Sequence, residues 1–372
     1  MQSRFARLAA PALLAVTLIA AAAGAQTPPA AGDPATLAAK VEQLSASFEA
    51  LNHRLDELMK VGDDNLWFAR VGDVAIVEKV RITGPPPWKE KNPTAIGAGN
   101  PLKFYAYVFI PRTLPKGGKC PLLILPHGGV HADFTTYHTH IVREMVAQGY
   151  VVVAPEYRGS TGYGKDLYQK IDYGGRETED CDAARQWAID TYPFVDGSRA
   201  AMVGWSHGGL IALMAVFAHP EHYRCAFAGV PVSDLVERLG YWGEEYAAAF
   251  SAPYHIGQTV AENLPEYKKR SPVWHVEKLQ TPLLVHGNTN DEDVNVIEVE
   301  HLVQALKAAG KEKLLDYEIY QDEPGGHSFD RLDTTRAQEI RVKIYGWLAR
   351  HLDPPSPLRS VADLRRAAYR QP

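Results

Sequence analysis

The 372-residue sequence has few cysteines and no excess of basic residues. Its three cysteines, Cys120, Cys181 and Cys225, are too few for a disulfide scaffold, and we expect buried, reduced thiols. The 39 Lys and Arg residues are outnumbered by 44 Asp and Glu residues, which gives a formal net charge of -5. The sequence therefore lacks the basic field that nucleic-acid binding requires, and we expect no nucleic-acid partner.

Long apolar runs are also absent, except for one near the amino terminus. Arg4 and Arg7 precede the run from Leu8 to Ala23, which ends in small residues. This order is typical of a secretory signal peptide, residues 1–25, and not of a membrane anchor. Cleavage there would give an exported protein, periplasmic or secreted, with no membrane partner.

The next segment, residues 26–65, combines a disordered lead with a heptad pattern. Asp33 and Pro34 provide an N-cap and a first-turn proline. Apolar residues then recur at alternating spacings of four and three, at Leu37, Val41, Leu44, Phe48, Leu51, Leu55 and Leu58. This period is typical of a coiled-coil seam. The amphipathic helix either forms a homo-oligomer through residues 37–58 or packs its apolar stripe on the main domain.

Residues 66–352 alternate between short apolar runs and helix-like stretches. Segments 75–83 and 103–110 are predicted to be antiparallel strands. Further strands are predicted at 121–125, 150–154, 200–204, 225–229 and 282–285. Continuous apolar strands separated by helices predict an α/β class, with a mostly parallel, doubly wound sheet covered on both faces. Residues 353–372 are predicted to be a carboxyl-terminal tail.

A strand near Val203 runs into Gly204-Trp205-Ser206-His207-Gly208 and then into a helical stretch. A strand, a sharp turn and a helix around Gly-x-Ser-x-Gly form a nucleophile elbow, in which the glycines leave room for a strained serine. A serine hydroxyl is a weak nucleophile until an imidazole takes its proton and a carboxylate orients that imidazole. The sequence must therefore supply Asp and His further along the chain.

Both residue types follow in loops after later strands. The strand 282–285 leads to the acids Asp291 and Asp293, and the strand 316–320 leads to His327 in a glycine-rich loop. The order Ser, Asp, His matches that of the elbow-containing hydrolases. Because both loops leave the carboxyl edge of a parallel sheet, we expect them near Ser206.

Several blocks resemble the catalytic domain of the prolyl oligopeptidase family of serine peptidases, in family order. They are His127-Gly128-Gly129, Tyr157-Arg158-Gly159-Ser160-Thr161-Gly162-Tyr163-Gly164, the elbow, Val230-Pro231-Val232-Ser233-Asp234, Arg270-Ser271-Pro272, Asp-x-x-Val and Gly-His-Ser-Phe. The resemblance covers about residues 76–352 and implies an α/β-hydrolase fold. The interval from 26 to 65 is too short for the β-propeller that usually precedes this domain, so we expect none there.

The resemblance also implies catalytic roles. Ser206 would be the nucleophile, His327 the general base and acid, and Asp291 the orienting carboxylate. Asp293 is the alternative acid, but the family's aspartate stands three residues before the valine, which favours Asp291.

Backbone N–H groups would form the oxyanion hole. The resemblance points to those of His207 and Gly129, with Gly128 as the next choice. Trp205, Trp242 and Val294 are the candidates for substrate contacts.

The resemblance implies a peptidase acting on small peptides, whereas the same triad also suits a carboxylesterase acting on small acyl esters. A third, weaker interpretation is a non-catalytic exported oligomer that only binds. No cofactor is implied. The His-rich segment His127, His131, Asp133, His138 and His140 invites a zinc site, but its spacing supplies no complete ligand set, so we expect no metal.

Overall fold

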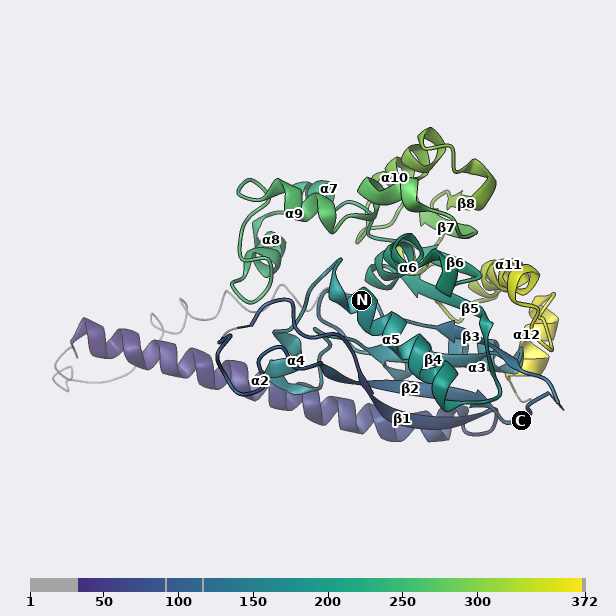
Figure 1. Ribbon diagram of the computed structural model, residues 1–372, viewed down its shortest axis with the longest axis horizontal. Coiled ribbons are helices and arrows are strands. Elements are labelled where there is room, and N and C mark those ends of the chain that lie inside the picture. Colours follow the sequence, from purple (N-terminus) through teal and green to yellow (C-terminus); the bar gives the residue numbers. More distant parts are fainter. Residues whose placement is uncertain (1–32, 91, 116, 370–372) are drawn as a thin grey trace, which may run out of the picture. The chain divides into compact units, whose positions relative to one another are not determined.

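The computed structural model describes residues 33–369 except positions 91 and 116 (Figure 1). The expected signal peptide lies outside these residues, so it stays a prediction. Within the described ranges, no helix combines the length and apolar character needed to cross a bilayer. The chain divides into two compact units, one ending at Leu51 and one covering Asn52–Pro372. The second unit contains all the strands.

Eight strands form one sheet in the order β1-β2-β4-β3-β5-β6-β7-β8. The antiparallel pairs are β1 with β2 and β2 with β4, and the remaining pairs are parallel. This arrangement confirms the predicted mostly parallel α/β sheet with antiparallel amino-terminal strands. The strand bounds are β1 Ala75–Thr83, β2 Lys103–Pro111, β3 Cys120–Ile124, β4 Val151–Glu156, β5 Val195–Trp205, β6 Cys225–Gly229, β7 Leu283–Asn288 and β8 Leu315–Tyr320.

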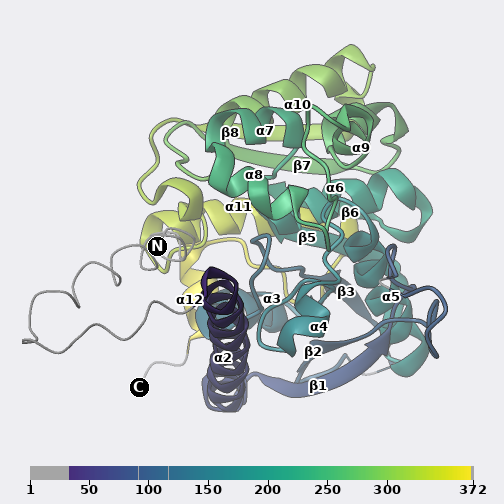
Figure 2. The same cartoon turned by 90° about the vertical axis from the view of Figure 1, so that its left-hand side faces the viewer.

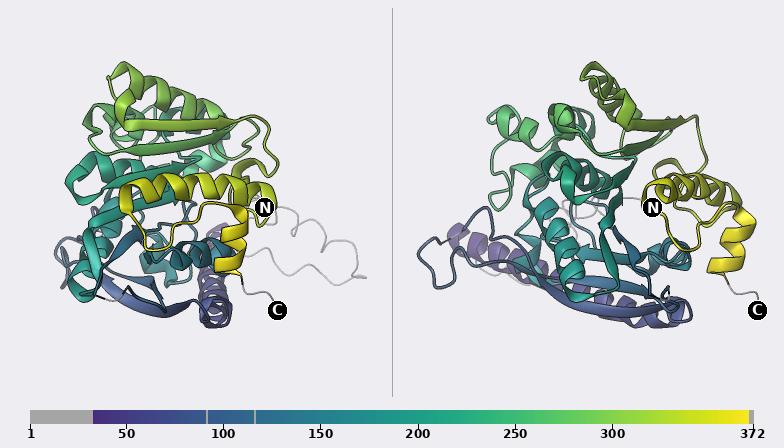
Figure 3. Two further views of the ribbon diagram at one scale, coloured as in Figure 1. Left: turned by 90° about the vertical axis from the view of Figure 1, so that its right-hand side faces the viewer. Right: turned by 45° about the vertical axis from the view of Figure 1, so that its right-hand side comes forward.

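Helices cover both faces of the sheet (Figures 2 and 3). Helices α5 (Arg176–Thr191), α6 (His207–Ala218) and α10 (Val296–Ala308) contribute to one buried cluster. Helices α3 (Thr139–Ala147), α11 (Thr335–Leu352) and α12 (Val361–Ala368) contribute to the other. The remaining helices are α2 Pro34–Val71, α4 Gly164–Tyr168, α7 Leu235–Trp242, α8 Glu244–Ser251 and α9 Leu264–Lys269, with 3-10 turns η3 Thr136–His138, η4 Pro220–His222, η5 Pro272–Lys278, η6 Glu312–Leu314 and η7 Gly326–Ser328.

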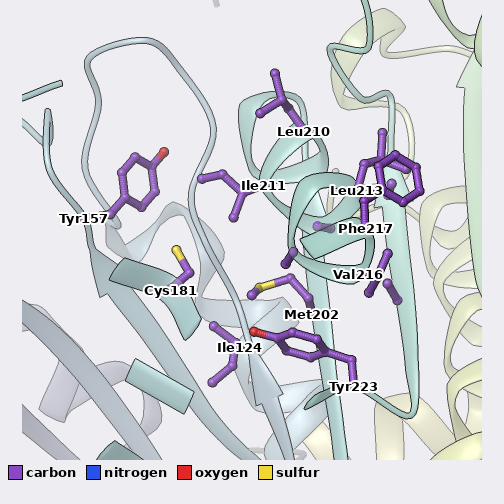
Figure 4. Packing of buried hydrophobic residues seen from close by; sticks show 14 of the residues in the cluster. Ile124, Tyr157, Cys181, Met202, Leu210, Ile211, Leu213, Val216, Phe217 and Tyr223 are labelled. Atoms are coloured by element: carbon purple, nitrogen blue, oxygen red, sulfur yellow. The ribbon is translucent and has the colours of Figure 1, made fainter. Parts of the chain in front are cut away.

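The central strand β5 shows how one strand serves both clusters. Ala200 and Met202 belong to the cluster on the α6 face, and Ala201 and Val203 belong to the other. Successive side chains on a strand point to opposite faces, so a strand buried on both faces reads as one continuous apolar run. Figure 4 shows Met202 within the cluster that the apolar side chains of α6 complete.

Some predicted boundaries were wrong. Strand β5 begins at Val195 instead of residue 200, because Val195 and Asp196 pair with β3 ahead of a register shift. The predicted tail contains helix α12, which buries Leu364 and Ala368. All three cysteines are buried and unpaired, which confirms the prediction of buried thiols.

The heptad segment is helical, as predicted, and continues to Val71. The second unit contains its carboxyl-terminal part, which buries Lys60, Trp67 and Val71. Leu55 and Leu58 are 52% and 67% exposed. The prediction that the apolar stripe packs on the main domain is therefore wrong for Leu55 and Leu58. Pairing with a second copy stays a prediction, which the molar mass in solution decides.

A buried ion pair joins α11 to α3. The Arg341 guanidinium donates to both carboxylate oxygens of Glu144 at 2.7 and 2.8 Å, and neither side chain is exposed. Glu144 also accepts a hydrogen bond from Tyr345. Because a charge left without its partner in the interior retains its full desolvation cost, this pair constrains how α11 packs.

We expect the R341M variant to lower the free energy of unfolding by about 3–5 kcal/mol, since it leaves the Glu144 carboxylate buried and uncompensated. The matched control is R336M on the same helix, whose side chain is half exposed and pairs with Glu323. That change should cost no more than about 1 kcal/mol. Urea denaturation checks both values, and equal losses would contradict the argument.

Candidate active site

Ser206 occupies the strained turn between β5 and α6. Its φ of 60° and ψ of -124° lie outside the regions that L-residues normally adopt. The backbone is held in place because the Ser206 N–H donates to Gly229 on β6, at 2.9 Å, and the Leu210 N–H donates to the Ser206 carbonyl. The turn therefore has the geometry predicted for a nucleophile elbow.

The flanking glycines are required by space. A Cβ on Gly204 would lie 2.1 Å from the carbonyl oxygen of Gly208, and a Cβ on Gly208 would lie 2.4 Å from that of Pro126. Real side chains do not tolerate such distances. This agrees with the argument from the sequence that only hydrogens fit beside the serine.

His327 forms its main contact with Asp291. The imidazole Nδ1 lies 2.8 and 3.0 Å from the two carboxylate oxygens of Asp291. One of these oxygens also accepts the backbone N–H groups of Asp293 and Val294, at 2.8 and 2.9 Å. The Asp291 carboxylate is 1% exposed and the imidazole 14%. A buried carboxylate fixed by two backbone donors is well suited to orient an imidazole.

Asp293 approaches the other imidazole nitrogen. Its carboxylate lies 3.8 Å from His327 Nε2 and is 44% exposed. Burial favours a higher pKa for Asp293, but the nearby His327 and Arg238 together hold that pKa below its usual value. The geometry thus gives Asp291 the Nδ1 contact and leaves Asp293 at the open side of the ring.

Arg238, on α7, fixes the aspartate loop and was not identified from the sequence. Its guanidinium donates to the Asp293 carboxylate and carbonyl, both at 2.9 Å, and to the hydroxyls of Tyr241 and Tyr246. A single arginine in an amphipathic helix carries no recognisable motif. Only the tertiary contacts reveal this role.

Two further residues hold the histidine loop. The amide of Asn288, at the end of β7, donates to the carbonyls of Glu323 and Gly326 at 3.0 and 3.1 Å. Trp205, beside the nucleophile, donates its indole N–H to the buried carboxylate of Asp330 at 2.8 Å. The serine turn is thereby tied to the loop that carries His327. Sequence analysis missed both Asn288 and Asp330.

The loop after β3 lies against the serine. A Cβ built on Gly128 would lie 3.2 Å from the Cβ of Ser206 and 3.7 Å from its Oγ. The Gly129 carbonyl accepts from the His207 imidazole at 2.8 Å, and Gly129 adopts a φ of +87°. In the described part of the chain, the N–H groups of Gly128 and Gly129 donate no hydrogen bond. The N–H of His207 lies at the first turn of α6, where it has no helical partner.

The three predicted side chains come from neighbouring positions along one sheet edge. Ser206 follows β5, Asp291 follows β7 and His327 follows β8, and β6 lies between β5 and β7. Among the described residues, the Ser206 hydroxyl forms no hydrogen bond. Catalytic hydrogen bonds are often long in the absence of substrate.

The residues expected to contact substrate differ in exposure. Trp205 and Val294 are buried, at 3% and 1% exposure. Trp205 donates to Asp330 and Val294 packs in the core, so a substrate contact by either residue stays a prediction. Trp242 is half-buried and donates to the carbonyl of Asp293, which places it next to the aspartate loop.

The His-rich segment is used for internal hydrogen bonds. His127 contacts the Ser160 hydroxyl at 2.9 Å, and His131 contacts the Gly159 carbonyl at 2.8 Å. Burial lowers the pKa of each to about 4, so both imidazoles are neutral at pH 7. In the described residues, the only three-residue group with metal-ligand geometry lies elsewhere, at His219, Glu221 and His222.

Comparison with known proteins identifies the family of this chain. Residues 136–355 match the prolyl oligopeptidase family (Peptidase_S9). The human acylamino-acid-releasing enzyme is 28% identical over 61% of this chain and 31% of its own length. Dipeptidyl aminopeptidase BIII of Pseudoxanthomonas mexicana is 28% identical over 70% of this chain and 38% of its own length. The chain thus spans about a third of the length of these relatives.

Solved structures share the fold. The acylaminoacyl peptidase of Pyrococcus horikoshii superposes with a TM-score of 0.61 at 19% identity, covering 78% of this chain and 44% of that one. A puromycin-hydrolyzing peptidase of Mycobacterium tuberculosis gives a TM-score of 0.60 at 22% identity, covering 75% and 40%. The fold is therefore that of the α/β-hydrolase peptidases, and the chain belongs to the prolyl oligopeptidase family of serine peptidases.

Proposed function

We propose that the protein is a serine peptidase that cleaves small peptides through a Ser206-His327-Asp291 triad and a covalent acyl-enzyme. The observation that carries this proposal is the contact of His327 Nδ1 with the buried Asp291 carboxylate, at the sheet edge where Ser206 occupies its strained turn. The strained backbone at Ser206 raises the free energy of the folded state, and together with the His327–Asp291 contact it provides what nucleophilic catalysis needs.

The contact with Asp291 keeps the proton of the neutral imidazole on Nδ1, so the lone pair of Nε2 is available to Ser206. As Ser206 Oγ attacks the carbonyl carbon of the scissile bond, Nε2 accepts the hydroxyl proton. The tetrahedral intermediate then collapses when Nε2 returns that proton to the leaving amine. Water attacks the acyl-enzyme in the same way, and this second step releases the acid and regenerates the serine.

Negative charge that develops on the substrate oxygen needs donors already in place. The N–H of His207, immediately after the nucleophile, is one candidate. The second candidate is the N–H of Gly129, with Gly128 as the alternative, since this loop touches Ser206. Donors with no partner among the described residues lose no hydrogen bond there when they bind an oxyanion.

The names of the relatives support a peptide substrate. They include acylamino-acid-releasing enzymes and a dipeptidyl aminopeptidase, and these names describe the release of acylamino acids and peptidase activity. The serine mechanism hydrolyses esters as well, so a carboxylesterase is the alternative activity, and simple binding without catalysis is the third.

We expect a fluorophosphonate probe to label the wild-type protein and not the S206A variant. Wild type should also hydrolyse short aminoacyl anilides, at a rate that S206A lowers by several orders of magnitude. Labelling and anilide release measure the two effects, and S206C tests whether another nucleophile in the same place retains labelling. If wild type hydrolyses only acyl esters, the carboxylesterase activity replaces the peptidase activity. If the probe does not label wild type, only the proposal of binding without catalysis is left.

The choice between the two aspartates is tested by D291N and D293N. In D291N the amide cannot hold the imidazole in the required tautomer, so we expect kcat to fall about 10⁴-fold, as in other triads. D293N is the matched control because Asp293 does not contact Nδ1, and we expect it to lower kcat less than about tenfold. Steady-state kinetics with one anilide measure both, and a larger loss in D293N would reverse the assignment.

We also propose that the protein is exported. The support is the order of Arg4, Arg7, the apolar run and the small residues that end at Ala25. Expressed in its native host, the protein should be recovered outside the cytoplasm with Gln26 as its first residue. Amino-terminal sequencing checks this, and an intact Met1 on the cytoplasmic form would reject it.

A further inference from the structure

A buried lysine on α2 reaches the core beside the glycine loop that touches Ser206. Lys60 is 2% exposed, and its Nζ lies 2.6 Å from Glu156 at the end of β4 and 3.2 Å from Asp133. It also donates to the carbonyl of Phe134. A lysine is rarely buried unless it is paired, so these contacts indicate a specific role.

The contacts of Lys60 and Glu156 meet the glycine loop, residues 127–136, at both ends. At the distal end, the Glu156 carboxylate accepts the Phe134 N–H at 3.1 Å. At the proximal end, the same carboxylate lies 3.5 Å from His127 Nε2. His127 precedes Gly128, whose position against Ser206 was described above. The ion pair therefore bonds to the distal end of the loop and lies beside the neutral imidazole of His127 at its proximal end.

A second residue of α2 contacts the same loop. The carboxylate of Asp63, one turn from Lys60, accepts the backbone N–H of Thr136 at 2.9 Å and also its hydroxyl. Residues three apart lie on one face of a helix. Trp67, one turn further, stacks on Phe134 with an interplanar angle of 10°. Three successive turns of α2 thus each place one side chain, Lys60, Asp63 or Trp67, against the distal end of the loop.

Helix α2 also lies close to the glycine-containing block at residues 157–164. A Cβ on Gly162 would lie 2.7 Å from the Cβ of Lys60, and one on Gly164 would lie 2.9 Å from the Glu57 carboxylate. Both glycines adopt positive φ. The block therefore accommodates the helix, and α2 precedes the region matched by the family, which begins at residue 136.

We propose that Lys60 and Asp63 are positioning residues that hold the glycine loop, and with it the candidate oxyanion donors, against Ser206. This inference rests on the proposed function, since it assigns α2 to the catalytic arrangement of that site. The part of α2 that begins at Asn52 then supports the active site.

The charge state of Glu156 explains why Lys60 is required. Burial raises the pKa of Glu156 to about 7, although Lys60 lowers it. Without the cation the pKa of Glu156 would be higher still, so a larger fraction of the carboxyl group would be protonated at neutral pH. A neutral carboxyl is a weaker acceptor for the Phe134 N–H than a carboxylate, so the distal end of the loop would loosen.

The test compares K60M and D63N with the control K79M. Lys79 pairs with Asp64 on α2 but contacts none of residues 127–136 in the described structure. Hydrogen exchange measured by mass spectrometry follows the loop without reference to activity. We expect faster exchange at 127–136 in K60M and D63N, unchanged exchange in α10, and a wild-type pattern in K79M.

Kinetics then separate positioning from simple stabilisation. With kcat expressed per fluorophosphonate-titrated site, K60M should lose about 100-fold in kcat, because a small displacement of a donor has a large effect on the transition state. KM should change less than about threefold, and the affinity for a peptide boronate, which forms a tetrahedral adduct with the serine, should fall in parallel with kcat.

A lower melting temperature with wild-type kcat per site, boronate affinity and loop exchange would overturn the inference and leave Lys60 as an anchor only. If K60M does not fold, D63N decides by the same three measurements. An unlabelled and inactive wild type would instead refute the proposed function, and the exchange data would still report whether α2 holds the loop.

Discussion

The lack of space around Ser206 is the constraint on which the rest of the site depends. The strands β5 and β6 hold the serine backbone, and the carbonyls of Gly208 and Pro126 lie where any side chain at the flanking positions would have to go. The hydrogen-bonded turn fixes the Ser206 backbone, so the sheet sets the direction of its Cα–Cβ bond. The imidazole and the carboxylate can then be supplied by loops from β7 and β8, provided that those loops are held as firmly.

The way the loops are held accounts for the different environments of the two aspartates. Asp291 lies inside its loop, where two backbone N–H groups and the imidazole surround it. Asp293 points outward, and Arg238 compensates its charge. Two carboxylates only two residues apart thereby have distinct surroundings, and the buried one orients the imidazole. In the histidine loop, the buried carboxylate of Asp330 accepts a hydrogen bond from Trp205 and so holds this loop against the serine turn.

Helix α2 extends this network to a segment that precedes residues 136–355, which match the family. Its buried face carries Lys60, Asp63 and Trp67, and all three contact the end of the glycine loop. Lys60 and Glu156 must be buried together, because either charge alone would have an uncompensated desolvation cost in the interior. This makes the second half of α2 a part of the catalytic domain, and not a linker ahead of it.

Much of the architecture followed from local patterns. Apolar runs on strands buried on both faces predicted the α/β class and the mostly parallel sheet, and the glycines around Ser206 predicted the elbow, since both reflect rules that act over a few residues. The predicted start of β5 was wrong and helix α12 within the tail was not predicted, because register shifts and long-range packing set them.

Residues that act across the fold could not be found in this way. Arg238, Asn288, Asp330 and Lys60 carry no motif, and each is defined by a partner at least 35 residues away. For the same reason the bond of Trp205 to Asp330 could not be predicted from the sequence. The sequence by itself determines which residue types are available for the chemistry. Which of them meet, and which charges are paired, depends on the burial and distances that only the folded sheet creates.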